Sequence, residues 1–178
     1  TELAWHAYYL RTASFYDAFY GRRSTSQGGM YLYDMGFNGN SRDTAQHALP
    51  LVYLEPDLAR DSLLTLLEVT DPDGESPYCT HGYGRRDPVY FDPSDTDIYL
   101  VWLATEYLFA TRDWALLDEV VDYYPPGGTE SATVWEHVVQ AFRHLRDNVG
   151  FGAHGLVLVR NADWNDGLQL EVPREEWP

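Results

Sequence analysis

The residues best suited to catalysis or binding lie near the end of the 178-residue chain, in the stretch NADWNDGL at 161–168. An indole face such as that of Trp164 stacks on the apolar surface of a pyranose, and the amide of Asn165 offers both a donor and an acceptor to paired hydroxyls. Asp163 and Asp166 flank this pair. Beside an aromatic wall and a second carboxylate, an aspartate is expected to have a raised pKa and to stay protonated, as a general acid must. The stretch is a candidate carbohydrate site, and the alternative is a turn in which the acids cap and the tryptophan packs.

A second group of candidate binding residues lies in NSRDTAQH at 40–47, at the expected start of a helix. Arg42 presents a planar fork of donors suited to sugar hydroxyls or to an anion. Asp43 is able to accept hydrogen bonds from hydroxyls or from backbone N–H groups. The simpler interpretation is a capping arrangement, with Ser41 at the N-cap and Asp43 in the first turn. The residue types alone leave both interpretations open.

Neither the acidic stretch DPSDTD at 92–97 nor the histidines predict a metal site. DPSDTD lacks the spacing and the turn glycine of a calcium loop, so we expect it to cap the helix that follows. His6, His137 and His144 fall on helical faces, where packing or surface roles are expected. No group of histidines and acids has the spacing of metal ligands, so no metal is predicted.

Hydrophobic periodicity predicts that the elements holding these residues are helices. In the clearest, at 132–148, apolar residues such as Val138 and Phe142 share one face and polar residues the other. DIYLVWLATEYLFA at 97–110 is apolar nearly all round, which predicts a buried helix. Only GLVLV at 155–159 resembles a strand. The expected helices are at about 2–19, 42–53, 57–69, 96–111, 114–122 and 132–148.

Local signals place the ends of several of these helices. Pro56 occupies the first turn of one helix, and Ser94 precedes another as a capping residue. Pro50 falls inside the helix at 42–53. Because proline lacks the N–H that a helix interior needs, we expect it to kink or shorten that helix.

The connections between the expected helices are unequal in length. Those at 20–41, 70–94 and 149–166 are long, whereas those at 54–56 and 112–113 are very short. Helices that alternate up and down, with long loops at one end and tight turns at the other, build toroids or solenoids whose long loops share one face.

The candidate site depends on the direction of the last helix. All three long loops meet on one face if 132–148 runs antiparallel to 96–111, with the short segment 114–122 a detour along the opposite end. The opposite direction would carry the NADWNDGL stretch to the wrong face. We expect the first arrangement, which brings the two groups of candidate residues together.

Composition excludes several classes of function. A net charge of −16 argues against nucleic acid or an anionic membrane surface as a partner. No apolar run reaches the roughly 18 residues of a membrane span. The single Cys79 excludes an internal disulfide and is typical of a reducing compartment, so we expect a cytoplasmic location.

Four stretches together resemble glycoside hydrolase family 94, in their order and spacing. They are DMGFNGNSRDTAQHALPLVYLEP, EYLFATRDW, TVWEHVVQAFRHLRDNVGFGAHGL and ADWNDGL. That family contains cellobiose and chitobiose phosphorylases and the phosphorylase-like domain of cyclic β-1,2-glucan synthases. The resemblance implies an all-α fold, part of an (α/α)6 toroid or six-hairpin barrel, with its active site where the long loops meet. By this similarity Asp166 is the general acid, and Trp164 and Arg42 shape the sugar subsite.

The sequence also departs from the family pattern. The phosphorylases read RD-x-x-Q-D, whereas here Gln46 is followed by His47, which changes the expected contacts to the sugar. An arginine expected about ten residues before Arg42, to serve phosphate, is replaced by the run Met30-Tyr31-Leu32. The helices amount to roughly five of the twelve in such a toroid. We therefore interpret residues 1–178 as a fragment of a single catalytic domain, inactive alone.

Three functional hypotheses follow, and the first is an inverting glycoside phosphorylase. Asp166 would protonate the oxygen of a β-glucosidic bond in an oligosaccharide, and inorganic phosphate, the co-substrate, would attack the anomeric carbon. No other cofactor is expected. The full-length enzyme is a candidate homodimer. The second is an inverting hydrolase, which needs a second carboxylate about 6.5–9.5 Å from the acid. Asp43 is one candidate, and a residue after Pro178 is the favoured one. The third is a non-catalytic helical module that binds sugar or a partner protein.

Overall fold

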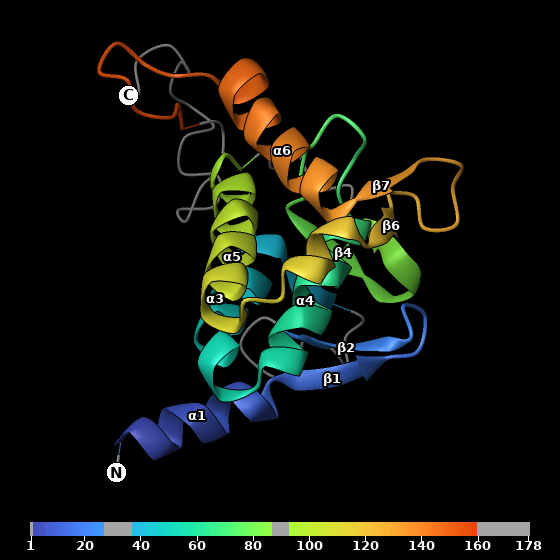
Figure 1. Ribbon diagram of the computed structural model, residues 1–178, viewed down its shortest axis with the longest axis vertical. Helices are drawn as coiled ribbons and strands as arrows, with labels where there is room; N and C mark the ends of the chain where they lie inside the picture. The colour runs from blue at the N-terminus through green and yellow to red at the C-terminus, as the bar shows by residue number, and fades with distance from the viewer. Residues whose placement is uncertain (1, 27–36, 87–92, 160–178) are drawn as a thin grey trace.

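The computed structural model describes residues 2–26, 37–86 and 93–159. Its centre is a group of three helices, α3 (Ser41–Leu54), α4 (Pro56–Glu68) and α5 (Asp95–Thr111), and a fourth helix, α6 (Val134–His144), packs against α5 (Figure 1). The dominance of helices matches the expectation from periodicity. None of the helices among these residues is both long enough and apolar enough to cross a lipid bilayer.

The core forms because α3, α4 and α5 each turn small or branched apolar side chains toward the others. Burying each leucine or valine side chain stabilises the fold by about 1.5–3 kcal/mol relative to exposure. Alanines in α3 allow close approach of its neighbours, and leucines of α4 and α5 fill the space between them. The fully buried members of this cluster include Ala45, Ala48, Leu51, Leu58, Leu63, Leu67, Leu100, Leu103, Leu116, Val134 and Ala141.

The expected effects of two prolines on their helices compare differently with the structure. Pro56 stands in the first turn of α4, as expected, where its missing N–H costs nothing. Pro50 is expected to kink or shorten the second helix; it does not shorten it, since α3 continues through it to Leu54, and the kink stays a prediction. Packing of the last turn explains the difference: Leu51 and Val52 are buried in the core, which holds this turn in place.

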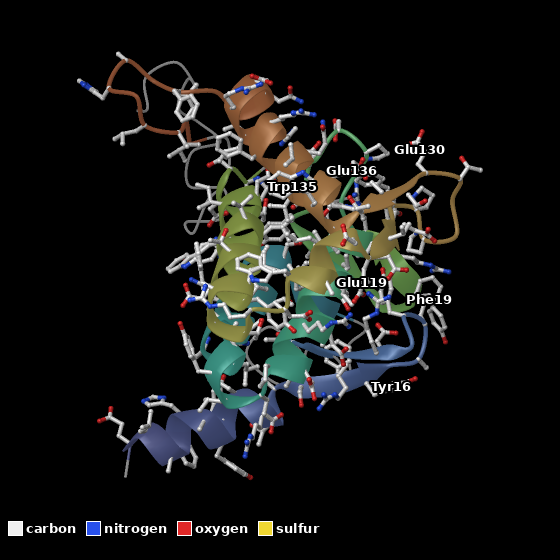
Figure 2. All side chains as sticks on the ribbon, in the orientation of Figure 1. Tyr16, Phe19, Glu119, Glu130, Trp135 and Glu136 are labelled. Carbon is white, nitrogen blue, oxygen red and sulfur yellow. The ribbon has the colours of Figure 1, made fainter. Side chains whose placement is uncertain are left out.

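The expected helix at 2–19 is wrong beyond its first part. Helix α1 ends at Thr12, and a hairpin follows, β1 (Ser14–Asp17) paired antiparallel with β2 (Arg22–Thr25). Phe15 is buried, whereas Tyr16 points away from the hairpin with 61% of its surface exposed (Figure 2). Alternate residues therefore face opposite sides, which is the period of a strand and not of a helix.

A small sheet joins the first two long loops. Its order is β3 (Phe37–Asn40), β4 (Cys79–His81) and β5 (Arg85–Arg86), all antiparallel. Strand β3 leads directly into α3, so the pairing fixes the start of that helix beside the loop that precedes α5. An all-α description is therefore incomplete, and 155–159, the one expected strand, contributes a single bridge, between Phe151 and Val157.

The segment between α5 and α6 is a detour, as expected, but it is not a helix throughout. A 3-10 turn (Trp114–Asp118) leads to a hairpin of β6 (Val120–Asp122) and β7 (Ser131–Thr133). A capping box then starts α6. The Glu136 backbone N–H donates to the Thr133 side chain, and the Thr133 backbone N–H donates to the Glu136 carboxylate. In Figure 2, Glu136 and Trp135 project from this first turn.

Helix α5 is buried on one side only, so the expectation of a fully buried helix is wrong. Leu100, Leu103 and Tyr107 face α3, α4 and α6, whereas Trp102 and Phe109 are 50% and 60% exposed. Apolar residues all round a helix show that burial is possible on every side, but not which sides are covered. Phe142 on α6 is likewise half exposed, so the buried face of that helix is centred on Val134, His137 and Ala141.

Candidate active site

The start of α3 is held by the loop that precedes β4. Asn40 occupies the N-cap position without a side-chain capping bond, and the Ser41 hydroxyl donates to the Pro77 carbonyl at 2.6 Å. The expected capping role of Ser41 is therefore wrong. Its side chain instead ties the two long loops together, and its backbone N–H donates to the Tyr78 carbonyl at 3.0 Å.

Arg42 and Asp95 form a buried ion pair between the first turns of α3 and α5. The Arg42 Nη1 donates to Asp95 Oδ2 at 3.1 Å, and Nη2 lies 3.8 Å from Asp43 Oδ2. Both members of the pair are 7% exposed. The guanidinium is thus fixed between two carboxylates, each in the first turn of a helix, where negative charge is favoured by the helix dipole. This arrangement fixes the direction of the arginine fork.

Gln46 and His47 follow one turn along α3 and share a face with Asp43. The Gln46 Nε2 donates to the Tyr99 hydroxyl at 2.8 Å, which again joins α3 to α5. The His47 Nδ1 lies 3.0 Å from the Ser26 carbonyl at the end of β2. All four sequence-predicted residues of the NSRDTAQH group therefore lie together on the first two turns of α3.

DPSDTD holds α5 through contacts other than the expected cap. Ser94 makes no side-chain capping bond, contrary to expectation. Asp97 is 2% exposed; its Oδ1 accepts from the Ser76 backbone N–H at 3.0 Å, and its Oδ2 contacts His144 Nδ1 at 2.7 Å. Because Asp97 starts α5 and His144 ends α6, the two helices run antiparallel. The predicted direction of α6 is confirmed, and the third long loop leaves from the end at which α3 and α5 begin.

The four residues Asp163, Trp164, Asn165 and Asp166 lie outside the described residues. Their approach to Arg42 and Asp43 stays a prediction. Beside the ion pair there is a narrow crevice, lined by Asn40, Arg42, Tyr78, Pro93, Asp95 and Thr96, that leaves no room for a water molecule. Ligand pockets typically measure about 300–1,000 Å³, so this crevice is too small for a disaccharide.

Sequence reasoning missed Asp95 and Tyr99 as partners of the α3 residues. The sequence predicts only a capping role for Asp95, because capping explains an acid at a helix start without any distant partner. The signal for pairing was that Arg42 also falls at a helix start. A guanidinium buried there requires a nearby carboxylate, and only the tertiary fold shows which one provides it.

Comparison with known proteins gives a family match over nearly the whole chain. The family model described as "Glycosyl hydrolase 94 superfamily, catalytic domain" matches residues 4–176. The chain is 34% identical over 127 residues to solabiose phosphorylase from Paenibacillus borealis, covering 71% of this chain and 15% of that protein. It is 29% identical over 153 residues to N,N'-diacetylchitobiose phosphorylase from Vibrio furnissii, covering 72% of this chain and 18% of that protein.

A third relative is 3-O-beta-D-glucopyranosyl-beta-D-glucuronide phosphorylase, also from Paenibacillus borealis. It is 27% identical over 129 residues, covering 71% of this chain and 16% of that protein. The chain therefore spans less than a fifth of the length of these three curated relatives.

Proposed function

The chain belongs to the glycosyl hydrolase 94 superfamily, and on that premise we propose that its protein is an inverting glycoside phosphorylase. The Asp166 carboxyl donates its proton to the glycosidic oxygen as the bond to the anomeric carbon breaks. Inorganic phosphate attacks that carbon from the opposite face and gives a sugar 1-phosphate of inverted configuration. Since phosphate is already an anionic nucleophile, the protein needs no base to activate it.

The observation that carries the proposal is that the three relatives described above are all named as phosphorylases. Their names specify different disaccharides, so the shared chemistry is transfer of a glycosyl group to phosphate and not recognition of one sugar. We propose a β-linked disaccharide or short oligosaccharide as the substrate class.

The contacts of Arg42 support a role in the sugar subsite and not in binding phosphate. Its guanidinium already lies against Asp95 and Asp43, at 3.1 Å and 3.8 Å. Two carboxylates around one cation leave no excess of positive charge for a phosphate dianion. A guanidinium whose orientation is fixed is suited to hydroxyl groups, which accept its hydrogen bonds without adding charge. Gln46 and His47 extend the same surface by one turn.

The residues Asp163, Trp164 and Asn165 complete the proposed subsite. The tryptophan stacks on one face of the sugar ring, and the asparagine amide pairs with two hydroxyls. The neighbouring Asp163 carboxylate raises the pKa of Asp166 through like-charge repulsion, which favours the protonated form that the reaction needs.

A hydrolase on the same scaffold is the second candidate. It is favoured by one feature of the sequence, the absence of the arginine expected about ten positions before Arg42. In a hydrolase, a carboxylate such as Asp43 would activate water on the side of the sugar opposite Asp166. A sugar-binding module without catalysis is the third.

One assay separates the three. The full-length protein is incubated with β-linked disaccharides, with and without inorganic phosphate, and sugar 1-phosphate and free sugar are measured. We expect sugar 1-phosphate only when phosphate is present, and loss of this product in Asp166→Asn. Asp118→Asn, a change at an exposed acid on the 3-10 turn, is the control. Release of free sugar regardless of phosphate would indicate a hydrolase, and binding without turnover would indicate the module.

A further inference from the structure

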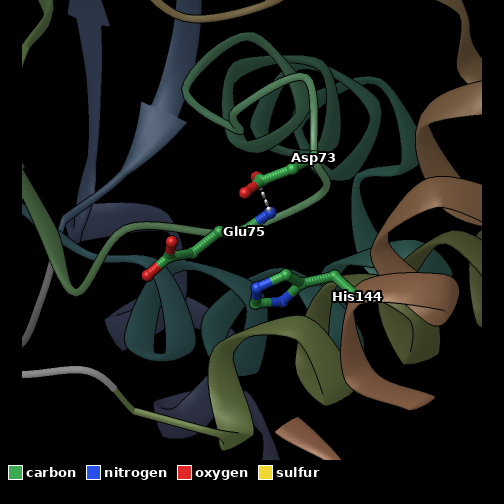
Figure 3. A group of neighbouring side chains, drawn as sticks. All are labelled: Asp73, Glu75 and His144. Carbon is green, nitrogen blue, oxygen red and sulfur yellow. Dashed lines mark hydrogen bonds between the residues drawn. The ribbon is translucent and has the colours of Figure 1, made fainter. Parts of the chain in front are cut away.

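Three ionisable side chains gather at the end of α6, and none of them belongs to the Arg42–Asp95 pair. They are Asp73 and Glu75, from the loop after α4, and His144, from the last turn of α6 (Figure 3). One ligand atom from each lies within 4.8 Å of the others. His144 is 4% exposed, Glu75 is half-buried and Asp73 is exposed, so the group opens toward solvent on its carboxylate side.

The loop that holds the two carboxylates is locked into one shape. The backbone N–H of Asp71 donates to the Glu75 carbonyl at 3.0 Å, and that of Glu75 donates to Asp73 Oδ1 at 3.2 Å. The loop is also pressed on α6. The Gln140 side chain donates to the Asp73 carbonyl at 3.1 Å, and a Cβ placed on Gly74 would meet the Gln140 carbonyl oxygen at 2.3 Å. The carboxylates therefore reach the end of α6 on a preorganised support.

Asp97 orients the imidazole from the other side. Its Oδ2 lies 2.7 Å from His144 Nδ1, so Nε2 is the nitrogen that would ligate a cation near Asp73 and Glu75. A carboxylate bonded to the far nitrogen fixes the tautomer of a metal-bound histidine and increases the basicity of its ligating nitrogen. The Asp97–His144 pair has this form.

We propose that Asp73, Glu75 and His144 bind a divalent transition metal ion, with Zn²⁺ as the best fit. One imidazole nitrogen and two carboxylate oxygens suit Zn²⁺, whereas Ca²⁺ and Mg²⁺ prefer oxygen ligands alone. Zn–N and Zn–O distances of about 2.0–2.2 Å place tetrahedral ligands about 3.3–3.6 Å apart. Rotation of the exposed Asp73 side chain, which gives up the bond from the Glu75 N–H to its Oδ1, would close that difference, and water would complete the fourth position.

The sequence predicted no metal site because its ligands are far apart in the chain and no short motif joins them. The fold brings them together by packing the loop after α4 against the last turns of α6. A bound ion would join three segments, namely the loop after α4, the start of α5 through Asp97, and the end of α6. It would stiffen the end of the helix group at which Arg42 and Asp95 also lie.

Metal binding by the full-length protein tests the proposal without reference to its enzyme activity. The protein is stripped with a chelator and titrated with ZnCl₂ by calorimetry, and its thermal unfolding is followed with and without Zn²⁺. We expect one site of the wild type to be lost in the double variant Asp73→Asn/Glu75→Gln, and each single change to weaken that site more than about 10-fold. Both positions lie at the solvent-facing side, so the variants are expected to fold.

The matched control is Asp118→Asn/Glu130→Gln, which removes the same charges at two exposed positions. It should bind Zn²⁺ as the wild type does, and Mg²⁺ should not replace Zn²⁺ in either protein. Equal Zn²⁺ stoichiometry and affinity in the wild type and in Asp73→Asn/Glu75→Gln would overturn the proposal, as would the absence of Zn²⁺ binding to the wild type. Sugar phosphorolysis does not enter the readout, so the two proposals fail independently.

Discussion

Replacing Asp95 with asparagine tests whether its buried ion pair with Arg42 holds the starts of α3 and α5 together. The change keeps the shape of the side chain but removes the carboxylate that accepts from Arg42 Nη1 at 3.1 Å. Removing one partner of a buried ion pair costs about 3–5 kcal/mol, because the other charge is left without compensation. Asp43 remains 3.8 Å from the guanidinium and offsets part of this loss. We therefore expect a loss of about 3 kcal/mol in the free energy of unfolding.

The reverse change should be more costly. Arg42→Met leaves Asp43 and Asp95 near each other without a cation between them, so we expect a loss of about 4–5 kcal/mol. In the double variant, Arg42→Met/Asp95→Asn, the uncompensated charge is smaller than in Arg42→Met alone. The loss of unfolding free energy in the double variant should then be smaller than the sum of the two single losses by more than about 1 kcal/mol.

Urea denaturation of the wild type, the two single variants and the double variant gives this interaction energy. Asp118→Asn, at an exposed acid, should stay within about 0.5 kcal/mol of the wild type. The reasoning is refuted if both single variants also stay within that range, or if their effects add, because the pair would then contribute nothing beyond a surface contact.

Three further predictions concern positions where the fold leaves little freedom. Gly74→Ala should lower the free energy of unfolding by about 2 kcal/mol or more in urea denaturation, since Gly74 has φ +96° and a Cβ there would meet the Gln140 carbonyl; an unchanged midpoint would contradict this close approach. Thr133→Ala should cost about 1 kcal/mol in the same assay by removing the capping bond to the Glu136 N–H, and no loss would mean that the cap does not stabilise α6. Burial lowers the pKa of His137 below 6.5, so the unfolded chain binds this proton more readily. Stability should therefore be complete above about pH 6.5 and decline below it, and the decline should be smaller in His137→Gln; an equal decline would refute the assignment.

The sequence predicts the long central helices well. The observed bounds of α3, α4 and α5 lie within one residue of the expected ones, because apolar periodicity and Pro56 act within the helix itself. The direction of α6 was also predictable, since short and long connections restrict which way a helix can run. Its confirmation rests on the contact between Asp97 and His144.

The β1–β2 hairpin was missed because its stability comes from pairing between segments, not from either one alone. Ser14–Asp17 is short and aromatic, and a helix pattern running in from residue 2 accounts for it equally well. The signal available in the sequence was Gly21, which has φ +66° in the connection, whereas the alternation of buried Phe15 and exposed Tyr16 is seen only in the fold. Glycine adopts such a left-handed conformation readily.

The candidate site was predictable in its residue types but not in its partners. The chemistry of a guanidinium beside an aspartate is readable from Arg42-Asp43. These residues, Gln46 and His47 lie on the first two turns of α3, and their part in a sugar site stays a prediction. That Asp95 would neutralise Arg42 is a property of tertiary packing between α3 and α5. The same limit explains why Asp73 and His144 were not grouped.

The effect of Asp166→Asn on kcat, compared between substrates with different leaving groups, tests the proposed proton transfer most directly. For a β-linked disaccharide, whose departing oxygen needs a proton, kcat should fall by about 10²–10⁴ relative to the wild type. For a dinitrophenyl β-glycoside, whose phenolate leaves without protonation, the fall should be less than about tenfold. Equal losses on both substrates, or full activity on the disaccharide, would contradict a general acid at position 166.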